Sequence, residues 1–149
     1  MIKIKLGSGN DTNNDRIDVD CRSLDGVDVV TDLDKHPWPF DNNYADLIIA
    51  RAIFEHLDDV VGALEECHRI LKSSGRLRIR GPREGGGNVW GDVTHKRGFN
   101  AHSFDHFDPS TRRGRQYDYG KGKWKILSKQ NVGANIEFVM RPIGKGPSE

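Results

Sequence analysis

The sequence predicts an α/β fold with a mostly parallel sheet, an antiparallel C-terminal strand and few helices near the N-terminus. Short apolar runs alternate with loops and with one amphipathic helix, as they do where strands are joined by crossover connections. The run at residues 45–50 is apolar almost throughout, as expected for a parallel strand buried on both faces. The last two runs flank a tight turn, which predicts an antiparallel hairpin.

The first three strands are expected at residues 2–6, 17–20 and 27–31. Polar residues and a turn at Asp25-Gly26 separate them, and the connections contain no convincing helix. Parallel crossovers usually need a dozen or more residues. Either one face of the sheet is thinly covered, in which case it offers a surface for a possible homodimer, or the strand ends lie elsewhere than expected.

One helix is predicted over about residues 58–73, followed by a strand over 76–80 that Pro82 ends. Asp58 and Asp59 suit its N-terminus, and Gly75 can supply a left-handed stop. Its apolar stripe has helical spacing and consists of Val60, Leu64, Cys67 and Leu71.

The second half of the chain becomes rich in glycine and polar residues from Glu84 to Asn100. His102 to Phe107 predict one short helix, and residues 110–123 predict a long loop. Strands over about 124–129 and 135–141 flank a turn at Gly133 and form the hairpin.

The length of the chain indicates one domain, and its charge is unevenly distributed. A chain of 149 residues suits a single domain with one core, so residues 1–149 are taken as one unit. Residues 1–92 contain 12 Lys and Arg against 17 Asp and Glu, whereas residues 93–149 contain 11 against 5. The basic second part can attract an anionic substrate or partner, or it can simply be a solvated face.

Cysteine usage and hydropathy favour a cytoplasmic protein. Cys21 and Cys67 do not make a disulfide framework, and Cys67 lies on the apolar side of the predicted helix. No signal peptide is recognisable, and no apolar run approaches the roughly 18 residues that a membrane span needs.

Three predicted strands end at residues suited to one ligand. Gly7-Ser8-Gly9 follows the first strand, and glycines let a charged group approach the backbone closely. Asp20 ends the second strand, where a carboxylate can accept hydrogen bonds from two ribose hydroxyls. Asp32 follows the third, where a carboxylate can accept a hydrogen bond from an amine or amide. Because ligands of open α/β sheets bind at the carboxyl ends of strands, these residues predict a nucleoside-binding edge.

The same residues belong to a longer pattern, which resembles the class I S-adenosylmethionine-dependent methyltransferases and most of all their methyltransferase type 11-like group. It spans about residues 3–82, with looser similarity at residues 94–97 and 103–107. Its parts are Lys5-Leu6-Gly7-Ser8-Gly9-Asn10, Ile17-Asp18-Val19-Asp20, Asp28-Val29-Val30-Thr31-Asp32-Leu33, Trp38-Pro39-Phe40, Asp41-Asn42-Asn43-Tyr44-Ala45-Asp46-Leu47-Ile48, Phe54-Glu55-His56-Leu57, Glu66-Cys67-His68-Arg69-Ile70-Leu71-Lys72 with Gly75, and Leu77-Arg78-Ile79-Arg80-Gly81-Pro82.

This resemblance implies a Rossmann-like fold, S-adenosyl-L-methionine as cofactor, a cofactor-binding half over residues 1–82, and substrate-side loops with the hairpin over residues 83–149. The glycines would pass under the methionine part of the cofactor, Asp20 would hold the ribose, and Asp32 with the Leu33 backbone would face the adenine. The Arg51 backbone would lie near the methionine carboxylate or amine. The implied cofactor residues are Gly7, Ser8, Gly9, Asp20, Cys21, Asp32, Leu33 and Arg51.

Two absent patterns narrow the choice. The third glycine of the dinucleotide fingerprint, which serves close helix–strand packing, is missing, and this argues against NAD. The fourth strand is followed by Ala50-Arg51-Ala52-Ile53-Phe54 instead of the Asp/Asn/Ser-Pro-Pro-aromatic signature of enzymes that methylate amino groups of nucleic acids.

Methyl transfer from a sulfonium depends mainly on alignment, and a base is needed only when the nucleophile carries a proton. His56 and His95 are the catalytic candidates. His56 follows the fourth strand and otherwise satisfies a backbone group at a helix start. His95 lies near Asp92, which can orient it, and is otherwise a polar loop residue.

Other basic and aromatic residues suggest alternatives. His102 and His106 have the i, i+4 spacing of two metal ligands, but no cluster completes such a site and a surface helix is the expected result. Arg112, Arg113 and Arg115 with Tyr117 and Tyr119 resemble an RNA- or phosphate-binding loop.

The function expected from the sequence is methyl transfer to an oxygen, or else to a nitrogen or carbon, of a small molecule or glycan. The alternatives are a degenerate partner subunit that keeps the fold without activity, and an RNA methyltransferase that uses its basic second part.

Overall fold

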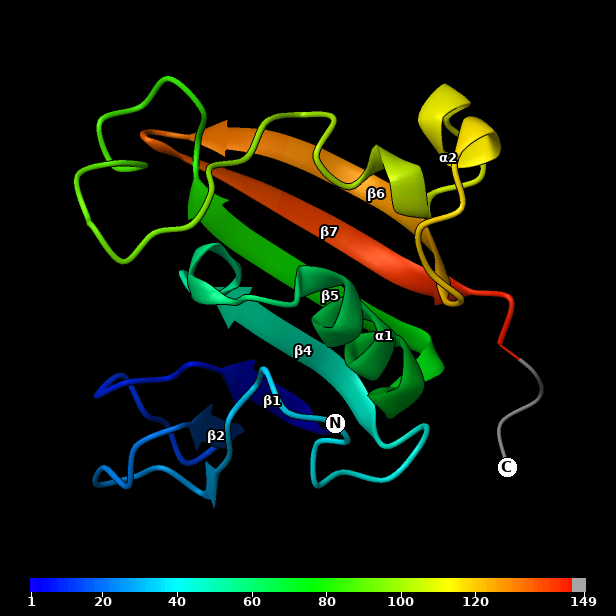
Figure 1. Cartoon of the computed structure of the whole chain (residues 1–149). Coiled ribbons are helices and arrows are strands. Elements are labelled where there is room, and N and C mark those ends of the chain that lie inside the picture. Colours follow the sequence, from blue (N-terminus) through cyan, green and yellow to red (C-terminus); the bar gives the residue numbers. More distant parts are fainter. Residues whose placement is uncertain (146–149) are drawn as a thin grey trace.

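A computed structural model describes residues 1–145 and shows a seven-stranded sheet in the order β3-β2-β1-β4-β5-β7-β6 (Figure 1). The first five strands run parallel, and β7 lies antiparallel between β5 and β6. The predicted fold class is thereby confirmed. The strands are β1 (Lys3–Leu6), β2 (Ile17–Asp20), β3 (Val29–Val30), β4 (Ala45–Arg51), β5 (Leu71–Pro82), β6 (Lys123–Val132) and β7 (Asn135–Ile143), and the helices are η1 (Phe54–His56), α1 (Val60–Ile70), η2 (Asp105–Phe107) and α2 (Arg112–Gln116).

The core lies on one face of the sheet, where α1 packs over β4 and β5 (Figure 1). Leu64 and Cys67 of the predicted stripe are fully buried there, and burial raises the pKa of the Cys67 thiol. The core continues toward β7 through Phe104, whose ring meets that of Phe138 edge-on with centroids 4.8 Å apart. One continuous hydrophobic cluster therefore joins the two halves of the chain.

Helix α1 begins as predicted but ends early. The Asp59 side chain accepts a hydrogen bond from the Gly62 amide at 2.8 Å, which caps the first turn. The helix ends at Ile70, and Leu71 is already extended and pairs with Ala45 of β4. The predicted stop at Gly75 is wrong, because that glycine lies inside β5. Pairing with the sheet overrides the helical propensity of the residues after Ile70.

The opposite face of the sheet has no helix over it among residues 1–145. The connections between β1, β2, β3 and β4 are loops and turns, so the predicted thin cover is confirmed. On β1 and β2 the loop between these strands covers part of this surface, so Lys5 and Asp18 are buried there. We call the rest of this surface the open face; none of its side chains is fully buried. It consists of the residues that alternate with the core positions, namely Lys3, Leu47, Ile49, Arg51, Arg76, Arg78, Arg80, Glu137, Val139 and Arg141.

Three predicted segments differ in detail. Strand β3 has only two residues, and the predicted helix at residues 102–107 is reduced to η2. The predicted loop at 110–123 contains α2, which the sequence did not indicate because it is short and rich in arginine and glycine. The Thr111 hydroxyl caps α2 by accepting from the Gly114 amide at 3.0 Å.

Within residues 1–145, no helix combines the length and the hydropathy that a membrane crossing requires.

Candidate functional site

The glycine loop after β1 lies where the strand order reverses, between β1 and β4. Gly7 and Gly9 have φ values of 63° and 55°, which glycine adopts without strain. A Cβ on Gly7 would lie 2.8 Å from Cδ1 of Ile53, whereas a Cβ on Gly9 would have only Arg22 nearby, at 3.8 Å. Ser8 is buried, and its amide donates to the Val19 carbonyl at 3.0 Å. The loop is therefore tight at Gly7 and open at Gly9.

Asp20, at the end of β2, anchors this loop. Its Oδ2 accepts from the Gly9 amide at 2.8 Å, and its Oδ1 accepts from the Arg22 amide at 2.9 Å. Burial raises the pKa of Asp20, but hydrogen bonds from the two amides and from the Arg22 side chain outweigh it and lower the pKa overall. The carboxylate is therefore ionised at neutral pH. Because a carboxylate offers about four acceptor directions, it keeps one free while the exposed Arg22 side chain covers another.

The other predicted cofactor residues differ in whether their side chain or only their backbone is available at this edge of the sheet. Asp32 is exposed, and its Oδ1 accepts from the Asp34 amide at 2.9 Å. The side chain of Leu33 is buried in the core, so only its backbone is available at the edge. Cys21 is an exposed free thiol. Arg51 ends β4, and its side chain belongs to the open face, which leaves its backbone at the edge.

A cavity of about 290 Å³ lies beyond the ends of β4 and β5. His95, in the loop after β5, lines this cavity, and His56 of η1 lies beside it with the two ring centroids 4.8 Å apart. The predicted neighbour Asp92 is close, since its Oδ2 lies 3.6 Å from Nε2 of His95. The cavity is lined by Ala52, Glu55, Pro82, Asn88, Gly91, Asp92, His95 and Asn135.

Glu55 is the residue at this cavity that the sequence analysis missed. Only 2% of it is exposed, and its Oε1 has no hydrogen-bond partner among the described residues. Burial raises the pKa of its carboxyl group. Its Oε2 lies 3.9 Å from Nε2 of His95. An acid directly after the buried Phe54 was the available signal, but the sequence analysis used it only as part of a family pattern.

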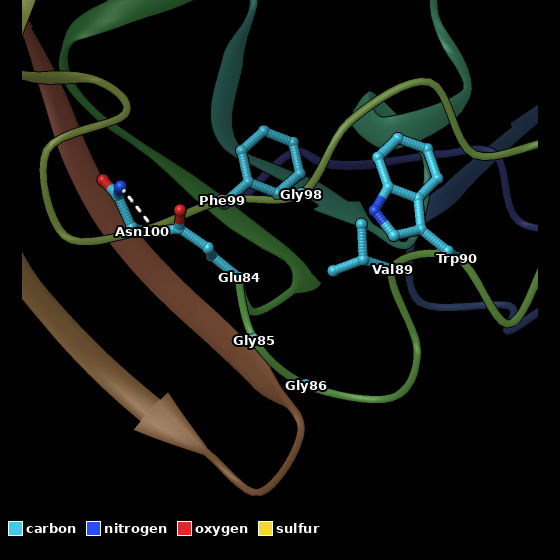
Figure 2. Close-up of a pocket in the computed structure, with 8 residues that line it drawn as sticks. All are labelled: Glu84, Gly85, Gly86, Val89, Trp90, Gly98, Phe99 and Asn100. Atoms are coloured by element: carbon cyan, nitrogen blue, oxygen red, sulfur yellow. Dashed lines mark hydrogen bonds between the residues drawn. The ribbon is translucent and has the colours of Figure 1, made fainter.

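A second cavity, of about 430 Å³ and open to solvent, is lined by the loop that follows β5. Figure 2 shows the side chains that line it. Trp90 lines it although 74% of this residue is exposed. Asn100 donates from Nδ2 to Oε2 of Glu84 at 2.9 Å (Figure 2). Val89 lines this cavity and also binds His95 through its carbonyl, so the two cavities share one loop. From the sequence, this segment is distinguished only by its many glycine and polar residues.

The remaining candidates lie away from this edge. Nδ1 of His102 is 3.0 Å from Oδ2 of Asp105, and the ring of His106 stacks on Tyr119 with centroids 4.6 Å apart. The predicted basic and aromatic loop does form a cavity, of about 400 Å³. It is lined by His106, Arg112, Arg113, Gln116, Tyr117 and Tyr119.

Comparison with known proteins identifies the domain. Residues 8–79 match the family model described as a methyltransferase domain. A comparison with curated proteins gives no match. The fold resembles that of an S-adenosylmethionine-dependent methyltransferase from Archaeoglobus fulgidus, with a TM-score of 0.67 and 15% identity over 94% of this chain and 85% of that chain.

Two further solved structures show the same fold. An S-adenosylmethionine-dependent methyltransferase from Aquifex aeolicus has a TM-score of 0.64 and 14% identity, over 94% of this chain and 81% of that chain. A complex between the Haloferax volcanii Trm112 methyltransferase activator and a methyltransferase gives a TM-score of 0.69 and 16% identity, over 99% of this chain and 84% of that chain. Together with the strand order, these matches show that the chain has the fold of the S-adenosylmethionine-dependent class I methyltransferases and that its residues 8–79 match the model of a methyltransferase domain.

Proposed function

We propose that this protein transfers a methyl group from S-adenosylmethionine to a small polar or glycan-type acceptor. The observation that carries the proposal is the edge at the β1/β4 switch point, where a glycine loop and an ionised carboxylate meet. When bound, the cofactor supplies an activated methyl group with sulfur as the leaving group. The protein then has to hold and align the two reactants.

The residues at this edge fit the cofactor. The open space at Gly9 suits close approach of the methionine part to the backbone, and the free acceptor direction of Asp20 suits a ribose hydroxyl. The 63% exposed Arg22 side chain has room to move away and release a second direction. Asp32 and the Leu33 backbone are proposed for the adenine. Ser8, Cys21 and the Arg51 backbone complete the proposed cofactor site.

The acceptor is proposed to bind under the loop after β5, so that residues 1–82 serve the cofactor and the later residues serve the acceptor. The two cavities of this loop have sizes suited to a small ligand or one sugar unit. The larger one combines the aromatic faces of Trp90 and Phe99 with the polar groups of Glu84 and Asn100. Such a mixture of apolar planes and hydrogen-bonding groups matches the two kinds of surface that a sugar presents.

His56 and His95 are proposed to handle the proton of a hydroxyl acceptor. Both lie at the end of β4, next to the edge that would hold the cofactor. A hydroxyl is protonated at neutral pH, so its attack on the methyl carbon requires removal of that proton. An acceptor with an unprotonated nitrogen would not need these residues. Substitution of the two histidines therefore tests whether the acceptor atom is a hydroxyl oxygen.

Transfer of tritiated methyl from labelled cofactor to a fractionated cell extract tests the proposal. We expect label in the small-molecule or glycan fraction. Label in the RNA fraction alone would replace the proposed acceptor class by the RNA alternative, which the cavity at Arg112 and Tyr117 would then explain. Binding of S-adenosylhomocysteine by calorimetry with no transfer to any fraction would favour the degenerate partner subunit.

The open face is the proposed surface for a partner. Arg78 and Arg80 of β5 project from it, and Arg78 pairs with Glu137 at 3.1 Å. If two copies meet through this face, salt should strengthen the dimer, because cations on both sides repel and salt screens them. Light scattering at low and high salt measures this. A monomer under both conditions would exclude the homodimer, and association that salt weakens would point to contacts elsewhere.

A further inference from the structure

We infer that Glu55, His56 and His95 form a binding site for a divalent transition-metal ion of the Zn²⁺ class. One ligand atom from each residue lies within 4.8 Å of the other two, and no other such group occurs among residues 1–145. Two imidazoles and one carboxylate make a donor set that first-row divalent metals bind, with a further coordination position left open. The role of the ion in catalysis, though not its binding, rests on the proposed methyl transfer.

The hydrogen bonds of His95 leave its Nε2 free. Nδ1 lies 2.8 Å from the carbonyl oxygen of Val89, which can only accept a hydrogen bond. In the neutral imidazole the proton therefore lies on Nδ1, and Nε2 carries the lone pair. That Nε2 faces Oε2 of Glu55 at 3.9 Å and Oδ2 of Asp92 at 3.6 Å. A backbone carbonyl that sets the tautomer in this way is a usual feature of metal-binding histidines.

His56 is set in the same tautomer by a chain of two hydrogen bonds. The Thr94 hydroxyl donates its only proton to Oδ1 of Asp92 at 2.7 Å. The same hydroxyl oxygen lies 3.2 Å from Nδ1 of His56, so it accepts a hydrogen bond from the N–H of that nitrogen. In the neutral ring of His56, Nε2 is therefore also the nitrogen with the lone pair. Two separate sets of contacts prepare both rings to donate a lone pair.

Glu55 supplies the independent evidence for a ligand. Only 3% of its side chain is exposed, the residue lines the cavity of about 290 Å³, and Oε1 has no partner among the described residues. A buried carboxylate without a partner is costly, and a cation would satisfy it. With Asp92 beside it, the site offers two negative charges to a divalent ion.

The scaffold around the three residues is tied together by the backbone. The Lys96 amide donates to the Glu55 carbonyl at 2.8 Å, and Nη1 of Arg97 donates to the Phe54 carbonyl at 2.6 Å. Lys96 also pairs with Asp58 through its side chain. These contacts hold the His95 loop against η1, so that the ligands do not need to be gathered from separate mobile parts.

A metal ion at this site would help a hydroxyl acceptor to lose its proton. A hydroxyl that coordinates the ion ionises more readily, and its proton passes to solvent. The oxygen lone pair then attacks the methyl carbon, while the carbon–sulfur bonding pair stays on sulfur. The products are the methylated acceptor and S-adenosylhomocysteine. In this form His56 and His95 act by holding the ion.

Calorimetry with ZnCl₂ on the full chain, without cofactor, tests the site. We expect one ion per chain, at least about 100-fold weaker binding for Glu55→Gln and for His95→Ala, and about tenfold weaker binding for Thr94→Val, which removes only the hydroxyl that orients His56. Absorption of CoCl₂-loaded protein in the visible range gives a second readout. The matched control is His102→Ala/His106→Ala, which removes two histidines elsewhere and should change neither result.

The outcomes separate this inference from the proposed function. Binding that survives Glu55→Gln and His95→Ala, or that the control variant abolishes, would overturn the metal site. Methyl transfer by a parent protein that shows no Zn²⁺ binding in calorimetry would overturn it as well and leave the methyltransferase intact. Specific Zn²⁺ binding without methyl transfer would support the site and count against the proposed activity. Thermal unfolding checks folding, and Glu55→Gln without metal should be no less stable than the parent.

Discussion

Asp20→Ala is expected to weaken S-adenosylhomocysteine binding by at least about 100-fold in calorimetry. The carboxylate would lose charge-assisted hydrogen bonds to the ribose, each worth about 1.5–3 kcal/mol, where 1.4 kcal/mol is a factor of ten. The substitution also releases the Gly9 amide from its bond of 2.8 Å, so the glycine loop loses its anchor. Both effects act on the same ligand, and this makes the expected loss larger than for any other single change at the edge.

Two further variants separate the contributions of Asp20. Asp20→Asn keeps an oxygen that can accept from Gly9 and removes only the charge, so it should bind more tightly than Asp20→Ala and more weakly than the parent. Asp15→Ala removes an exposed acid from the neighbouring loop and should leave the affinity unchanged. Equal affinity of Asp20→Ala and the parent would refute the assignment of Asp20 to the ribose.

The sequence was sufficient for the features that depend on local patterns. Strand ends at Gly7 and Asp20 follow from short apolar runs that stop at glycine and at an acid, and the structure places both at one edge. The helical stripe with Cys67 follows from spacing alone. Helix boundaries were less predictable, because the end of α1 depends on pairing of Leu71 with Ala45, a contact between distant segments.

The site beyond β4 was harder to predict from the sequence. His56 and His95 were recognised as residue types capable of proton chemistry, but their closeness depends on the loop after β5, whose course no periodicity determines. Glu55 gains its chemical character only from burial, which a single acid in a short helix does not reveal. The tautomers of His56 and His95 depend on contacts with Thr94 and with the Val89 carbonyl. Neither residue type indicates such a role in a sequence.

A buried polar network between α1 and the β3–β4 connection also depends on distant contacts. Glu66 is 8% exposed, and its Oε1 accepts from the Trp38 amide at 2.5 Å. Nε of Arg69 donates to Oε2 of Glu66 at 2.9 Å, and its Nη1 donates to the Phe40 carbonyl at 2.7 Å. The network holds the segment after Leu33 against the helix. The adenine side of the proposed cofactor site therefore rests on these two residues of α1.

Glu66→Ala is accordingly expected to lower the free energy of unfolding by about 3–5 kcal/mol, because it leaves both the Arg69 charge and the buried Trp38 amide without their partner. For a chain of this size this corresponds to a loss of about 10 °C in melting temperature, measured by calorimetry or circular dichroism. Glu66→Gln keeps an acceptor for Trp38 and should lose less. A melting temperature unchanged in Glu66→Ala would show that the network does not stabilise the fold.

The pH dependence provides a second signature of the same carboxylate. Burial raises the pKa of Glu66, but the hydrogen bonds from Arg69 and Trp38 and the Arg69 charge outweigh it, so the pKa falls below its ordinary value of 4.5. A depressed pKa in the folded state means that the unfolded chain binds the proton more tightly. The contribution of Glu66 is therefore complete above about pH 4.5 and is lost as the pH falls through the folded value. Urea unfolding between neutral pH and pH 3 should show the parent losing stability faster than Glu66→Gln, and parallel curves would contradict this assignment.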